Sequence, residues 1–65
     1  MCEFTVYLDG HDDENIVAER VIKATVKEEY ILLMGSDGKS YKIPNAKITK
    51  VDTIMTELIL ATNDQ

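Results

Sequence analysis

The chain has 65 residues, a formal net charge of −5 and a pI near 4.6, with a single cysteine. This length predicts one small domain, residues 1–65, and excludes an internal disulfide, so we expect a second subunit to add stability. The acidic balance argues against general nucleic-acid binding, because that affinity comes from lysine and arginine on phosphates. No apolar run approaches the ~18 residues of a membrane span and no signal peptide opens the chain, so we expect no membrane contact and a cytoplasmic protein.

Residues 4–8 alternate apolar and polar side chains, which predicts a half-buried strand directly behind Met1-Cys2-Glu3. Its start also bears on processing, because Met1 is usually removed before a residue as small as cysteine. A polar loop follows at residues 9–15. The pattern of residues 15–20 is compatible both with a helical turn and with an extended segment that leads into the next strand. Residues 20–27 again alternate and are rich in β-branched side chains, which predicts a second strand.

The apolar run at residues 30–34 predicts a strand buried on both faces, at the centre of a barrel or against another subunit. Asp37-Gly38 is a hairpin turn signal, and Pro44 should end strand pairing because it lacks a backbone donor. Further strands are expected at residues 39–43, 47–51 and 57–61. The sequence therefore predicts an all-β fold, a small, strongly bent antiparallel sheet or partly open barrel of about six short strands. Met34, Met55 and the remaining aliphatic residues are expected in the core.

Cys2 is the main candidate for chemistry. An α-amine titrates near ~8 and a free thiol near ~8.5, so both can lose protons to a metal near neutral pH. Together they would close a five-membered chelate ring, and adding a backbone nitrogen, such as that of Glu3, favours Ni(II) or Cu(II). Spacing alone leaves a second interpretation open, in which Cys2 is a small apolar residue at a strand start.

Two other groups of residues are weaker candidates. His11, with Asp12 and Asp13, could form a metal loop, although a solvated loop is the simpler interpretation and we expect His11 at the far end of the first strand from Cys2. A basic face could bind single-stranded RNA by charge and stacking, although alternating lysines are also typical of a solvent-exposed sheet face. Its members would be Lys39, Tyr41, Lys42, Lys47 and Lys50.

The opening Met1-Cys2-Glu3, the strand behind it, the chain length and the pattern from Ile43 to Asp52 together resemble the CooT family. The resemblance implies a non-enzymatic nickel-binding protein or nickel chaperone, linked to maturation of carbon monoxide dehydrogenase, that forms homodimers and binds Ni(II) through Cys2. It also implies a barrel-like fold, for which relatives have been labelled RNA-binding proteins. We therefore expect Ni(II) between two N-termini, held by Cys2 with its amine and backbone nitrogens.

Overall fold

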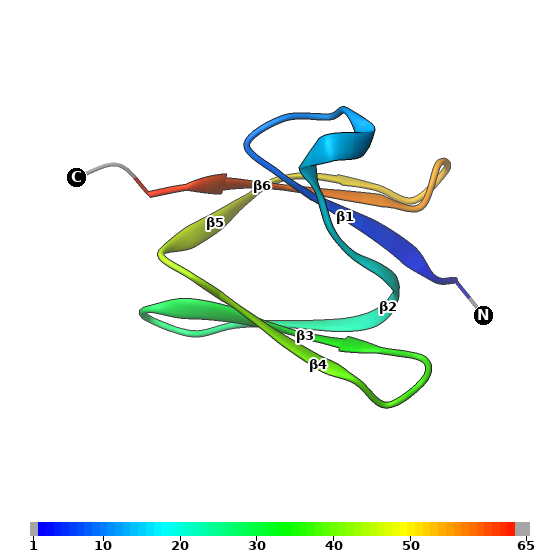
Figure 1. Cartoon of the computed structure of the whole chain (residues 1–65), viewed down its shortest axis with the longest axis horizontal. Coiled ribbons are helices and arrows are strands. Elements are labelled where there is room, and N and C mark those ends of the chain that lie inside the picture. The colour runs from blue at the N-terminus through cyan, green and yellow to red at the C-terminus, as the bar shows by residue number, and fades with distance from the viewer. Residues whose placement is uncertain (1, 64–65) are drawn as a thin grey trace.

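In the computed structural model, which describes residues 2–63, six strands form one curled sheet (Figure 1). The strand order is β4-β3-β2-β1-β6-β5. No helix among the described residues is long and apolar enough to cross a membrane. The elements are β1 (Phe4–Leu8), the 3-10 turn η1 (Asp13–Asn15), β2 (Ile16–Val26), β3 (Tyr30–Gly35), β4 (Ser40–Pro44), β5 (Ala46–Asp52) and β6 (Glu57–Thr62).

The pairing confirms the all-β prediction but adds one parallel contact. β1 and β6 run parallel, with Thr5 opposite Glu57 and Leu8 opposite Leu60, whereas the other neighbouring strands are antiparallel. At the end of this pair the carboxylate of Asp9 accepts hydrogen bonds from the amide and the hydroxyl of Thr62, and these bonds hold the pKa of Asp9 below its usual value. The first and last strands are therefore joined directly.

β2 is one long strand that bends at Arg20, and Val21, just after the bend, pairs with both neighbouring strands, with Phe4 of β1 and with Gly35 of β3. Its first half pairs with β1, placing Val6 opposite Ala18, and its second half pairs with β3, placing Ala24 opposite Leu33. Arg20 has a φ of 56°, in the left-handed region, and its carbonyl accepts a hydrogen bond from the Ser36 amide at 2.8 Å. Of residues 15–20, Asn15 ends the 3-10 turn η1 and residues 16–20 belong to β2, which begins four residues earlier than the predicted start at Arg20.

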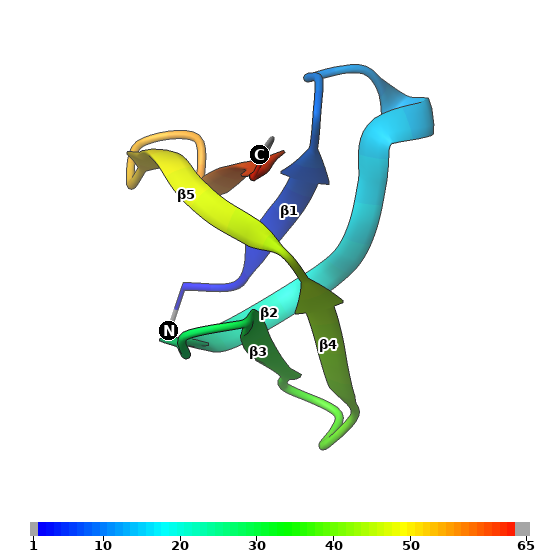
Figure 2. The same cartoon turned by 90° about the vertical axis from the view of Figure 1, so that its left-hand side faces the viewer.

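A corner at Asn45 curls the sheet. β4 and β5 lie on opposite edges of the sheet, yet only Asn45 separates them in the chain (Figure 2). Asn45 has a φ of 56°. Its backbone N–H donates to the carbonyl of Glu29 at 2.9 Å, and its carbonyl accepts the backbone N–H of Asn63 at 2.7 Å. Pro44 is the last residue of β4, as predicted. The edges are thereby drawn toward each other, which gives the bent, unclosed sheet that the sequence indicated.

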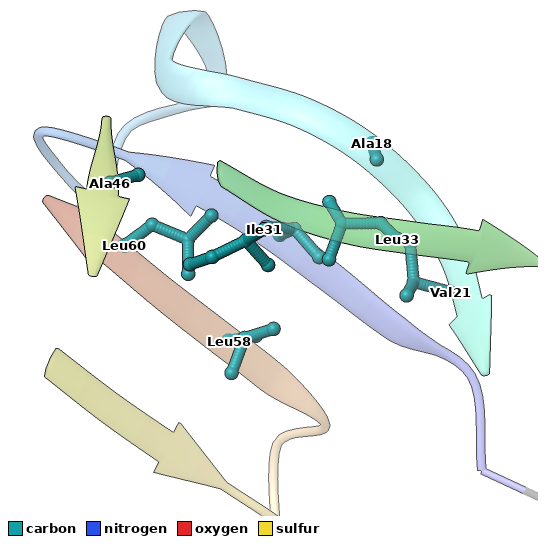
Figure 3. Close-up of a cluster of buried hydrophobic side chains, with 8 residues drawn as sticks. Ala18, Val21, Ile31, Leu33, Ala46, Leu58 and Leu60 are labelled. Atoms are coloured by element: carbon teal, nitrogen blue, oxygen red, sulfur yellow. The ribbon is translucent and has the colours of Figure 1, made fainter. Parts of the chain in front are cut away.

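The core lies inside the curl and is wholly apolar among the described residues. Figure 3 shows Ile31 between Leu33 and Leu60, so that β3 and β6 meet across the interior. Only one face of β3 is buried, because Tyr30, Leu32 and Met34 point outward and remain half-exposed. The expectation of a strand buried on both faces is therefore wrong within the single chain. The buried core cluster consists of Val6, Ala18, Val21, Ile31, Leu33, Ala46, Leu58 and Leu60.

Leu33 is fully buried, so shortening its side chain should destabilise the fold strongly. We expect Leu33→Ala to lower the free energy of unfolding by about 2–5 kcal/mol, since the lost burial adds to the cavity left behind. Urea denaturation followed by circular dichroism measures the change. Val26→Ala is the matched control, because Val26 is 61% exposed and its loss should cost less than about 1 kcal/mol. Equal losses in the two variants would contradict this packing.

Candidate functional site

Cys2 has an exposed, free thiol just before β1. Two residues later, Phe4 lines an open apolar hollow of about 140 Å³, at the end of the interior between β2, β5 and β6. Ile22 and Val51 in this wall are 43% and 57% exposed. The thiol is therefore accessible and close in the chain to uncovered apolar surface. The hollow is lined by Phe4, Val21, Ile22, Lys23, Ala24, Val51 and Leu58.

The turn between β5 and β6 lies at the same end of the molecule (Figure 1), because the amide of Thr5 donates to Thr56 O at 3.0 Å. This turn exposes two large apolar side chains, Ile54 at 90% and Met55 at 62%. Asp52 Oδ1 accepts the amides of both residues at 3.0 Å, and these bonds, that from Met55 first, lower the pKa of Asp52. The prediction that Met55 lies in the core is wrong, since the capped turn directs it outward.

Within the described part of one chain, Cys2 has no complete set of metal-binding side chains around it. Among residues 2–63, no group of three or more cysteine, histidine, aspartate or glutamate side chains is placed to hold a metal ion. A metal at Cys2 would need backbone nitrogens, the α-amine or a second chain as further ligands. Met1, whose removal would free that amine, lies outside the described residues.

The loop that carries His11 folds back over β1. Imidazole Nε2 of His11 lies 2.7 Å from Glu57 Oε1, and its ring packs edge-on against Tyr7 with 4.6 Å between the centroids. The side-chain amide of Asn15 holds the loop by donating to the carbonyl of Leu8. The same amide lies so close to Gly10 that a Cβ on residue 10 would clash with it. His11 thus lies beside Glu57, whose partner across the sheet is Thr5, and not beyond the far end of β1 as expected.

The residues of the predicted RNA face lie on two strands and in one turn. Tyr41 packs against the core, while its neighbour Lys42 is exposed and places its ammonium 4.4 Å from the centroid of Tyr30. Lys47 and Lys50 are on β5, at the opposite edge of the sheet from β4. Lys39 lies in the turn before β4. The tyrosine ring beside Lys42 is therefore that of Tyr30, which was not singled out from the sequence, and not that of Tyr41.

The surface around Cys2 includes side chains that were not singled out from the sequence. Ile22, Val51 and Ile54 read as ordinary strand or core residues, because each is aliphatic and stands in or near an apolar run. The one available signal was the Asp52-Thr53 turn, which places Ile54 and Met55 in a loop. Burial of Ile22 and Val51 depends on how the sheet curls, which local patterns do not report.

Tyr7 should titrate at higher pH than an ordinary tyrosine. Burial first, and then the negative charge of Glu57, raise the pKa of Tyr7 above 10.0. We expect Glu57→Gln to lower this pKa without restoring the ordinary value, as followed by tyrosinate absorbance. Because the folded pKa is raised, the stability contributed by protonated Tyr7 should be lost as pH rises above about 10. Glu28→Gln, in the β2–β3 turn, is the control; equal shifts in both variants would contradict the contact.

Comparison with known proteins agrees with the architecture. Residues 1–61 match the family model described as CO dehydrogenase accessory protein CooT. No curated protein matches the chain significantly. The crystal structure of a protein assigned to CooT, from Carboxydothermus hydrogenoformans, has a TM-score of 0.82 and 28% sequence identity, with 97% of this chain and 100% of that chain covered. The chain therefore belongs to the CooT family of CO dehydrogenase accessory proteins.

Proposed function

We propose that this protein holds Ni(II) as cargo between the two N-termini of a homodimer and delivers it to a nickel enzyme, with carbon monoxide dehydrogenase as the client that the family description suggests. The observation that carries the proposal is the exposed thiol of Cys2 at the uncovered apolar end of the sheet. The role is that of a carrier and not of a catalyst.

The donor atoms at Cys2 suit nickel. A thiolate with a neighbouring amine or amide nitrogen forms a compact N,S chelate, which favours Ni(II) or Cu(II) over tetrahedral zinc. The α-amine of Cys2 becomes available once Met1 is removed, and the amide of Glu3 is the next nitrogen in the chain. Because one chain provides a single thiol, a second chain would supply the matching donors from its own Cys2.

The exposed apolar side chains support pairing at this end. Ile22 and Val51 border the hollow, and Ile54 and Met55 extend from the adjacent turn. Covering this surface with a second copy would remove apolar area from water and bring two N-termini into the same region. Metal shared between two chains then stabilises the dimer by linkage, since the ion binds the paired form more tightly.

The first test is a nickel titration of the untagged protein at neutral pH, with thiolate-to-metal absorption and molecular mass followed together. We expect saturation at about one nickel per two chains, and no absorption band in Cys2→Ser, because the thiolate is the absorbing ligand. If Cys2→Ser binds nickel as tightly as the parent, the site is elsewhere. The chemistry leaves Cu(II) as a competitor, so the same titration with copper reports metal preference.

Two variants of the protein test which other atoms bind the nickel. A form that retains Met1 should bind nickel about tenfold or more weakly, corresponding to about 1.4 kcal/mol, because the α-amine of Cys2 is then an amide. His11→Gln should bind like the parent, since Nε2 of His11 lies against Glu57. Lost nickel binding in His11→Gln would instead favour the loop of His11, Asp12 and Asp13.

A further inference from the structure

The outer face of β2 and β3 carries a second hollow, of about 280 Å³, distinct in composition from the one near Cys2. Its floor is Leu32 and Met34, the half-exposed outward side chains of β3. Lys23 and Thr25 stand opposite Met34 and Leu32 across the sheet. We call this surface the lysine-rimmed groove, lined by Lys23, Thr25, Lys27, Leu32 and Met34.

The charge of the groove is opposite to that of the whole chain. Lys23 and Lys27 line the groove on the β2 side. Lys42 on β4 adds a third lysine on the other side of the floor, because Leu32 pairs with Thr25 of β2 on one side and with Lys42 on the other. Within residues 2–63, none of these three lysines forms a salt bridge, and no acidic residue lines the groove. The chain as a whole has a net charge of −5. Unpaired positive charge concentrated on one face of an acidic protein attracts an anionic partner and orients it.

The physical character of the groove selects a protein segment as that partner. Single-stranded nucleic acid binds by stacking its bases on aromatic rings, whereas the floor of this groove is aliphatic and the nearby ring of Tyr30 already pairs with the ammonium of Lys42. A second copy is disfavoured as well, because a two-fold contact would set the same lysines against each other. An acidic segment with an aliphatic side chain satisfies both parts of the groove, carboxylates for the lysines and an apolar group for Leu32 and Met34.

We propose that the lysine-rimmed groove docks an acidic, leucine-bearing segment of the client enzyme. Lys23 lines both this groove and the hollow near Cys2, so a segment bound here would lie along the side of the metal-binding end. The proposal rests on the proposed function for the identity of the partner, while the chemistry of the groove stands independently of it.

The probe is a short fluorescein-labelled peptide with a central leucine flanked by glutamates, titrated with the nickel-loaded protein at low salt and followed by anisotropy. We expect Lys27→Glu/Lys42→Glu to bind about tenfold more weakly, a loss of about 1.4 kcal/mol. Lys47→Glu/Lys50→Glu on β5 changes the net charge equally and should bind like the parent. Met34→Gln, similar in size, should weaken binding through the floor alone. Added salt should weaken binding by the parent.

Several results would overturn the assignment. These are no binding of the acidic peptide by the parent, equal binding of a peptide with glutamines in place of glutamates, or equal weakening by the two double variants. Tighter binding of single-stranded oligouridine, lost in Lys27→Glu/Lys42→Glu, would assign the groove to RNA instead. Nickel binding by the groove variant should match the parent, since neither lysine lines the hollow near Cys2. Loss of peptide binding alone therefore separates failure of the docking surface from failure of the nickel site.

Discussion

The left-handed backbone at Arg20 is the constraint on which the rest of the structure depends. A non-glycine residue in this conformation costs roughly 1–3 kcal/mol and persists only where its surroundings fix it. Here the Ser36 amide bonds to its carbonyl, and the next residue, Val21, is buried in the core. The bend lets one strand pair with β1 up to Val21 and with β3 from Val21 onward. The same bend brings Val21 and Ile22 beside Phe4, so it also forms the hollow near Cys2.

Features governed by neighbouring residues were predictable from the sequence. The strand behind Cys2 follows from the alternation of apolar and polar residues. The Asp37-Gly38 turn follows from the glycine, since Gly38 has a φ of 90°. The end of β4 at Pro44 follows from the backbone donor that proline lacks. The early start of β2 was missed because the backbone turns over at Arg20 and interrupts the alternation there. The parallel pairing of β1 with β6 joins residues more than fifty positions apart, and no local pattern reports it.

The candidate site likewise has one part that is visible in the sequence and one part that only folding assembles. That Cys2 precedes a strand is visible in the sequence, whereas its apolar surroundings come from β2, β5 and the turn at Ile54, which only the folded chain assembles. The curled sheet also separates two chemistries: an apolar end near the thiol, and a face where lysines surround Leu32 and Met34. The two proposed sites, one for an ion and one for a protein segment, thus lie on different surfaces of one small curled sheet.

The parallel pairing of β1 with β6 also constrains the order of folding. β1 has one neighbour, β2, that is close in sequence, but its other neighbour is the final strand, and contacts of large sequence separation form late because the loop entropy must be overcome first. Leu58 of β6 completes the hollow next to Phe4. Cys2 is synthesised before all six strands, yet its apolar surroundings are finished only when β6 docks. A chain that lacks β6 would expose the thiol of Cys2 without Leu58, and so without a complete hollow.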